Sequence, residues 1–220
     1  QYSRIVGRNP KLRRASFNSA NWAEEVEVLI LNYQRLKRIK NLDLLRNLRK
    51  LSLIGNDITA IDGLRYNILL EELSLESNDL RRLSGIFHLR KLRKLDLGRN
   101  KLTEVPDLSA LECLTQLSLE DNLIKSLRGL GSVKNLLELY IANNLLADMK
   151  EVNFLKAQPK LIILDIYGNP LCKNESARMF LIFNLKKLKV LDSESIDHSQ
   201  TLSAKSMYAG RLTAEMLESR

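Results

Sequence analysis

The chain has 220 residues, of which 45% are hydrophobic, and 35 Lys and Arg against 26 Asp and Glu give it a formal net charge of +9. This length allows a continuous buried core without disulfides or metals, and no run approaches the roughly 18 apolar residues of a membrane-spanning helix. No signal peptide is visible at the first residues. The positive charge raises nucleic acid or an acidic membrane surface as a partner, so its place in the fold has to be found first.

Residues 1–21 predict a basic linker or N-terminal arm. The segment QYSRIVGRNPKLRRASFNSA has five lysines and arginines, no acidic residue and no hydrophobic period. Such a segment has too little apolar surface to form a core of its own. Trp22, which follows it, is expected to cover the first unit of the next domain.

Residues 22–195 contain an internal repeat. The segment LRKLSLIGNDI at Leu48 recurs as LEELSLESNDL, LRKLDLGRNKL, LTQLSLEDNLI and LLELYIANNLL, each copy beginning 22 residues after the last. A degraded copy begins at Val26, with Gln34 in place of the asparagine, and a truncated copy begins at Leu188. The predicted repeats therefore start at residues 26, 48, 70, 92, 114, 136 and 161.

The alternation x-L-x-L-x within each copy predicts a short strand with its leucines on one face. A single coil cannot bury its own leucines, so neighbouring coils stack and their strands pair as a parallel sheet on the inner face of an arc. An asparagine recurs where the chain leaves each strand. We expect each buried amide to bond the backbone of its own and the adjacent coil, which is a structural role, at Asn56, Asn78, Asn100, Asn122, Asn144 and Asn169.

The pattern L-x-x-L-x-L-x-x-N-x-L resembles the signature of the leucine-rich repeat family. The resemblance implies an α/β fold, namely a right-handed solenoid with a parallel β-sheet on the concave face and 3₁₀ turns and short helices on the convex face. A 22-residue period leaves no room for a full outer helix. The longer interval 147–159 has room for roughly two helical turns, with these side chains facing inward: Met149, Val152, Phe154 and Leu155.

Residues 172–195 predict a cap over the last coil, and residues 196–220 a helical extension of two short helices broken at Gly210. We expect Asn174 to cap a helix through ESARMFLIFNL. The residues expected to cover the last coil are Met179, Phe180, Phe183 and Leu185. This cap resembles that of the SDS22-like class of leucine-rich repeat proteins. The cap and extension also resemble parts of a large multi-repeat protein, which implies that the chain is a piece of a longer one.

The sequence has no pattern that is typical of a catalytic or metal site. His88 and His198 have no obvious partner, and no glycine-rich phosphate loop is present. Cys113 and Cys172 stand at different points of different repeats, so we expect two buried thiols rather than a disulfide. We therefore predict no enzyme activity, no cofactor and no metal.

The repeat register predicts a concave face built from the residues two, four, six and seven positions after each repeat start. Three basic minus seven acidic residues give this face a formal charge of −4, although the whole chain is basic. An acidic trough with tyrosines at one end is expected to attract a basic surface or helix of a protein partner. The alternative, ordinary solvated side chains on an exposed sheet, stays open. The predicted partner-binding residues are Lys50, Glu72, Glu76, Lys94, Asp96, Arg99, Glu120, Asp121, Glu138, Tyr140, Asp165 and Tyr167.

These features predict a non-catalytic scaffold or adaptor in the cytoplasm, and the SDS22-like class implies cytoskeletal or ciliary association. Two alternatives stay open. One is a nuclear ribonucleoprotein component resembling the A-prime protein of the spliceosomal branch-site particle, and the other is a regulatory subunit of a phosphatase. Basic flanking loops favour nucleic acid, but the concave face lacks the aromatic platforms on which bases stack, and no membrane partner is predicted.

Overall fold

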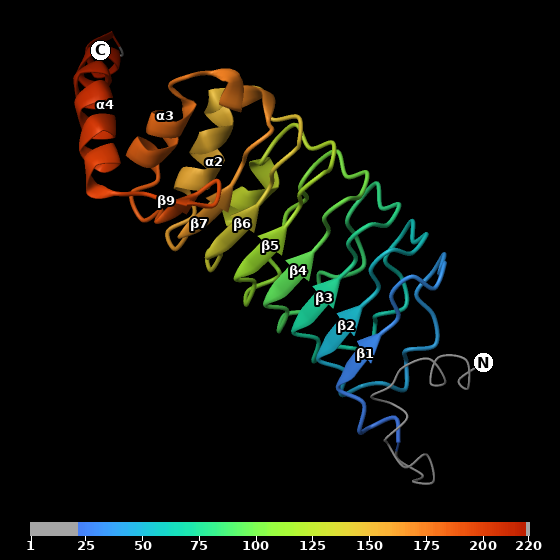
Figure 1. The fold of residues 1–220 in the computed structure, drawn as a ribbon. Coiled ribbons are helices and arrows are strands. Elements are labelled where there is room, and N and C mark those ends of the chain that lie inside the picture. Colours follow the sequence, from blue (N-terminus) through green and yellow to red (C-terminus); the bar gives the residue numbers. More distant parts are fainter. Residues whose placement is uncertain (1–21, 219–220) are drawn as a thin grey trace.

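The computed structural model describes residues 22–218, and these form an arc of stacked coils with one continuous sheet along the inner side (Figure 1). Nine short strands follow one another in chain order, all parallel except the last pair, β8 and β9. The predicted leucine-rich repeat solenoid is therefore confirmed. The strands are β1 Val28–Ile30, β2 Lys50–Ser52, β3 Glu72–Ser74, β4 Lys94–Asp96, β5 Gln116–Ser118, β6 Glu138–Tyr140, β7 Ile163–Asp165, β8 Val190–Leu191 and β9 Glu194–Ser195.

Equivalent residues of the repeat pair with each other across the sheet. Leu51 pairs with Leu73 and Leu73 with Leu95, so the central leucines form one buried row. Side chains alternate along each strand, so the central leucine points into the core and its two neighbours point to the concave surface. Each coil therefore adds its leucines to a core that runs the length of the arc. The register thus fixes which side chains reach the concave surface.

The asparagine ladder has the predicted structural role. Asn100 donates from Nδ2 to the carbonyls of Leu97 and Gly98 in its own coil and of Leu75 in the preceding coil. Its Oδ1 accepts from the backbone N–H of Leu80 at 3.0 Å. Asp192 of the cap bonds the last full coil at a different point, where its Oδ1 accepts the backbone N–H groups of Ile166 and Tyr167. Each amide thereby fixes the stacking distance of two coils.

The convex side carries turns and short helical segments: η2 Arg128–Ser132, η3 Met149–Glu151 and α2 Val152–Lys156. Asp148 begins η3 by accepting a hydrogen bond from the N–H of Lys150. Val152 and Leu155 are buried, whereas Met149 and Phe154 are partly buried against the core. The longer interval therefore holds a short helix with its apolar side chains inward, as predicted.

The C-terminal cap consists of η4 Pro170–Lys173, α3 Ala177–Asn184, the β8–β9 hairpin and α4 His198–Glu218. The prediction that Asn174 caps α3 is wrong, because its Oδ1 accepts from the N–H of Ser176, the residue before the helix. The predicted break at Gly210 is also wrong. α4 is a single helix, since one glycine inside a helix costs only about 1 kcal/mol relative to alanine.

The buried face of α3 differs from the expected one. Leu181 and Ile182 are buried, and Leu185 after the helix is buried as predicted. Phe180 and Phe183 are only partly buried, and their rings lie 5.5 and 5.6 Å from the ring of Tyr208 on α4. The two aromatic residues thus join the cap to α4, which the repeat pattern could not show.

Cys113 and Cys172 are both free thiols. The expectation that both are buried is wrong, because Cys172 is only partly buried and Cys113 is exposed on an outer turn. Its position immediately before a repeat start faces solvent, as the equivalent Lys91 and Asn47 show. None of the described helices is long and apolar enough to cross a membrane. The arm predicted for residues 1–21 lies outside the described residues, and the domain boundaries stay a prediction.

Candidate functional site

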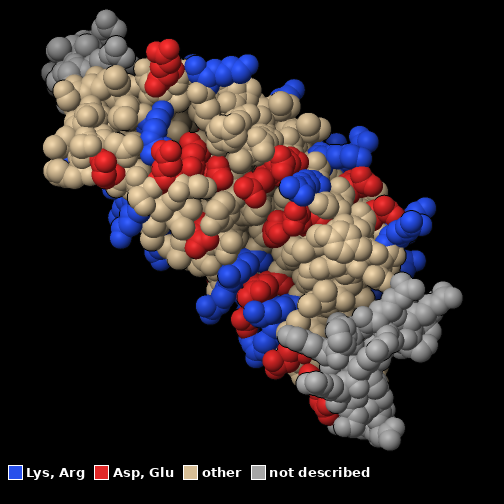
Figure 2. All heavy atoms as spheres, in the orientation of Figure 1, with Lys and Arg blue, Asp and Glu red and all other residues tan. Residues whose placement is uncertain are grey.

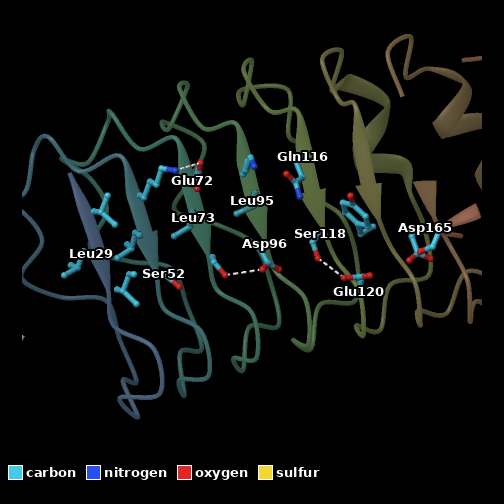
Figure 3. A pocket seen from close by; sticks show the side chains of 18 residues that line it. Leu29, Ser52, Glu72, Leu73, Leu95, Asp96, Gln116, Ser118, Glu120 and Asp165 are labelled. Carbon is cyan, nitrogen blue, oxygen red and sulfur yellow. Dashed lines mark hydrogen bonds and ion pairs between the residues drawn. The ribbon is translucent and has the colours of Figure 1, made fainter. Parts of the chain in front are cut away.

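The concave face carries a groove that runs across the strands, along the arc. Its volume is about 730 Å³, and its walls come from β1 to β7 with Ser193 of the cap (Figure 3). The floor includes the small side chains of Ser52, Ser74 and Ser118, which leave room between larger neighbours. Seven of the twelve predicted residues line this groove: Lys50, Glu72, Lys94, Asp96, Glu120, Tyr140 and Asp165.

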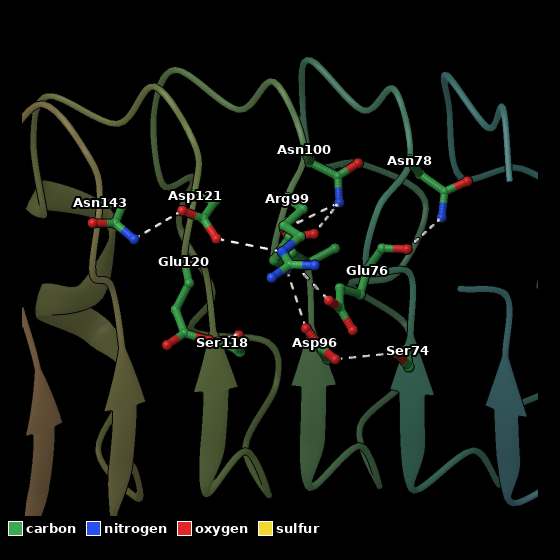
Figure 4. A network of polar contacts seen from close by, with 12 residues as sticks. Ser74, Glu76, Asn78, Asp96, Arg99, Asn100, Ser118, Glu120, Asp121 and Asn143 are labelled. Carbon is green, nitrogen blue, oxygen red and sulfur yellow. Dashed lines mark hydrogen bonds and ion pairs between the residues drawn. The ribbon is translucent and has the colours of Figure 1, made fainter. Parts of the chain in front are cut away.

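The other five predicted residues lie around the groove rather than in its lining. Glu76, Arg99 and Asp121 form a charged rim beyond the strand ends (Figure 4). Glu138 accepts a hydrogen bond from Tyr140, and Tyr167 is 67% exposed. None of the predicted residues is buried.

Ser193 also lines the groove, and the repeat pattern could not predict it, because this residue belongs to the turn between β8 and β9 and not to a repeat.

The rim contains a column of residues with left-handed backbone conformation, which lie after the strands and so do not follow the strand alternation. At the seventh position after the repeat start, φ is +53° at Arg99, +52° at Asp121 and +54° at Asn143. This conformation is uncommon outside glycine, and Gly55 and Gly168 occupy the same position in other coils. The chain turns sharply here, so two consecutive residues of each coil reach the concave side.

Two of the three basic residues predicted for this face are already paired. Lys50 Nζ lies 2.8 Å from Glu72 Oε1, and Arg99 Nε lies 3.8 Å from Glu76 and 3.5 Å from Asp121. Lys94 has no carboxylate within 4.0 Å among residues 22–218. The rim and the first coils are therefore close to neutral, and the unpaired negative charge lies further along the groove.

The unpaired carboxylates form an acidic cluster of Asp96, Glu120 and Asp165. Ser74 donates to Asp96 at 3.2 Å and Ser118 donates to Glu120 at 3.3 Å (Figure 3). Burial raises the pKa of Glu120, and the charge of Asp165 raises it further. Burial and then the charge of Asp192 raise the pKa of Asp165. Both shifts mean that the folded protein disfavours the charged carboxylates, so a bound cation would be stabilised.

Tyr140 stands beside the acidic cluster. Its hydroxyl donates to Glu138 Oε2 at 3.0 Å, and burial followed by this bond and its charge raises the pKa of Tyr140 to about 12. The phenol therefore stays neutral and offers an aromatic surface next to negative charge, a combination that suits a lysine or arginine side chain.

The charges separate over the whole molecule as well. In the view of Figure 2, Asp and Glu gather along the middle of the arc, and many of the Lys and Arg stand along its two long edges. Among the described residues, no group of three His, Cys, Asp or Glu is placed to hold a metal ion. The Nε2 atom of His88 lies 3.0 Å from the carbonyl of Leu64, which gives this histidine a structural partner.

Stacked coils with a leucine core and an asparagine ladder define a leucine-rich repeat protein. A family model described as Leucine-rich repeat matches residues 94–219, and one described as Leucine Rich repeats (2 copies) matches residues 68–110. The first match covers more than half of the chain, so the chain belongs to the leucine-rich repeat family. Members of this family generally act as scaffolds for protein interactions.

Two solved structures have a similar fold. Internalin C2 of Listeria monocytogenes has 22% identity and a TM-score of 0.57, over 77% of this chain and 81% of that chain. A chain in the SNF/U2A' complex of Drosophila melanogaster has 21% identity and a TM-score of 0.51, over 76% of this chain and 86% of that chain. At this level of identity the similarity shows the fold alone.

Proposed function

We propose that this chain is a non-catalytic adaptor that holds a basic segment of a protein partner in its concave groove. The acidic cluster of Asp96, Glu120 and Asp165 carries the proposal, because it places carboxylates without basic partners beside the ring of Tyr140. The raised carboxyl pKa values support it: burial raises them most and repulsion between carboxylates raises them further, and a lysine or arginine head group would offset both effects.

The groove is long enough for a secondary-structure element of the partner. The seven strands β1 to β7, about 4.8 Å apart, give the groove a length of roughly 29 Å, which suits a helix or an extended segment. The aliphatic stem of a bound lysine or arginine would cover Tyr140, and its cationic head would reach Glu120 and Asp165. The predicted membership in the SDS22-like class agrees with such a role, and we place the protein in the cytoplasm, with cytoskeletal or ciliary association.

The test removes charge from the groove without changing its shape. We expect Glu120→Gln together with Asp165→Asn to weaken binding of a labelled lysine- and arginine-rich peptide about tenfold in fluorescence anisotropy, because two close charge pairs are lost. The matched control is Glu104→Gln with Glu112→Gln, which removes the same charge from exposed outer turns. Equal loss in both variants would mean that net charge, and not the groove, attracts the peptide.

A second candidate is a ribonucleoprotein component. The basic edge at which the strands begin favours it, since several exposed cations stand there without carboxylate partners among the described residues: Arg90, Lys91, Arg93, Lys186, Lys187 and Lys189. The similarity to a chain of the SNF/U2A' complex agrees with this candidate, and such a protein would be nuclear. Filter binding to RNA at several salt concentrations tests it, because phosphate contacts give a steep dependence on salt.

A further inference from the structure

Four of the eleven exposed large apolar side chains among the described residues lie on the outer turns of the first three coils, away from the concave face. Leu44 is 53% exposed, Tyr66 44%, Ile68 56% and Phe87 36%. They stand 17 to 20 positions after their repeat starts, so the stacking of coils brings them onto one surface. With the basic residues between them they form the outer-turn patch: Leu44, Arg46, Arg65, Tyr66, Ile68, Phe87, Arg90 and Lys91.

The repeat does not require apolar residues at these positions. In the fourth coil the residue equivalent to Phe87 is Ser109, the one equivalent to Tyr66 is Ala110, and the one equivalent to Ile68 is Glu112. That coil keeps the same strand, turn and buried leucines as its neighbours. The apolar residues of the outer-turn patch therefore contribute surface rather than fold, and contiguous exposed apolar surface is typical of interaction sites.

The patch is also strongly basic. The guanidinium groups of Arg46 and Arg65 each lie 5.6 Å from the centre of the Tyr66 ring. Neither has a carboxylate within 4.0 Å in the part of the chain that the structure describes, and the same holds for Arg90 and Lys91. Residues 43–47, 65–69 and 87–91, which form these outer turns, contain a single acidic residue, Asp43.

We infer that the outer-turn patch is a second docking surface, which takes a protein segment that carries both carboxylates and apolar side chains. Arginines stacked on Tyr66 keep their N–H edges free, and these match carboxylates in a bidentate geometry. A wholly apolar segment would leave the arginines buried without partners, and a polyanion without apolar groups would leave Leu44, Ile68 and Phe87 exposed to water. Tyrosine and arginine are also the residues enriched at the centres of interfaces.

The chemistry of this surface is opposite to that of the groove. The concave groove selects a basic segment, whereas the outer-turn patch selects an acidic and apolar one. The two surfaces lie on different sides of the same coils, so both can be occupied together, and the chain then links two partners of opposite charge. The outer-turn patch does not depend on the proposed role of the groove, and either surface can fail its test alone.

The test uses replacements that the fourth coil already carries. The variant Tyr66→Ala, Ile68→Glu, Phe87→Ser removes the apolar surface, and the variant Arg46→Glu, Arg90→Glu reverses the charge at the position of Glu112. The probe is a labelled amphipathic peptide of glutamate, leucine and tryptophan. Control probes are polyglutamate, the same amphipathic peptide with lysine for glutamate, and a single-stranded RNA oligonucleotide.

We expect each variant to weaken binding of the acidic amphipathic peptide about tenfold, while Glu120→Gln with Asp165→Asn leaves that binding unchanged. Circular dichroism of each variant checks that the coils remain folded. Unchanged binding in both patch variants would overturn the proposal. Equally tight binding of polyglutamate or RNA would overturn it too, because the apolar groups would then contribute nothing. Concentration-dependent dimerisation that the apolar variant abolishes would show that a second copy covers the patch instead.

Discussion

The recurring asparagine shows how a single residue can be read from sequence and then explained by geometry. A buried amide is costly unless its donors and acceptors are matched, so an asparagine repeated every 22 residues predicts a repeated backbone contact. The structure confirms this at each coil, as for Asn78 with the carbonyls of Leu53 and Leu75. Asn67 was not predicted. It is fully buried and donates to the carbonyls of Leu42 and Leu45, but no other coil repeats it.

We predict that Asn100→Ala lowers the free energy of unfolding by about 3 kcal/mol, because several buried backbone groups lose their partner at once. Urea denaturation followed by circular dichroism measures the change. The control is Asn47→Ala, which removes an exposed amide bonded to the carbonyl of Glu24 and is expected to cost less than about 1 kcal/mol. Similar losses in the two variants would contradict a special role for the ladder.

The strands inside the repeats were predicted well, whereas the helices of the cap that follows the repeats were not. The two-residue alternation located β2 to β7, since a strand with one buried face has no other register. The cap helices follow no repeat, so only local residue preferences are available there, and these predict a cap at Asn174 and a break at Gly210 that the structure does not have. Whether Phe180 faces the core or α4 depends on where Tyr208 lies, which is a tertiary contact that no local pattern encodes.

The acidic cluster joins strands β4 and β7 with the turn after β5, and its electrostatic cost predicts a pH dependence. Raised carboxyl pKa values mean that between the unfolded and folded values the folded chain binds more protons, so stability falls as pH rises through this window. We expect Glu120→Gln with Asp165→Asn to be more stable than the natural chain at pH 7, and the gain to shrink near pH 4. Thermal unfolding of both proteins at pH 7 and pH 4 measures the gain in stability. A gain that grows toward acid pH would contradict raised pKa values at Glu120 and Asp165.

The molecule as a whole is a stack in which each coil contacts its neighbours. This follows from the 22-residue period, and the sequence was sufficient to predict it. The period could also place the side chains of the concave face, because strand geometry is the same in every coil. It could not show the outer-turn patch. The convex positions vary from Tyr66 to Ala110 without a rule, and only the stacked structure shows that the exposed apolar residues lie together.

Because each coil contacts only its neighbours, the same leucine-to-alanine substitution is expected to affect stability differently in a central coil and in an end coil. Leu117→Ala removes a fully buried side chain from a central coil, and we expect a loss of about 3 kcal/mol in urea denaturation. Leu29→Ala in the first coil is expected to loosen β1 and its neighbour instead, because an end coil has fewer contacts to lose. Hydrogen exchange by residue separates the two outcomes, and uniform loss of protection in the Leu29 variant would argue against a stack of coupled units.

The uneven placement of charge has a consequence for how a basic partner approaches. At low ionic strength, where the Debye length reaches about 30 Å, such a partner encounters the overall charge of +9 from a distance and is repelled. At physiological ionic strength the Debye length is about 8 Å, and this long-range repulsion is largely screened. Only at close range does the attraction of the acidic groove exceed this repulsion. Moderate salt then screens the long-range repulsion more than the short-range attraction, so encounter is selective for partners that arrive with the correct orientation.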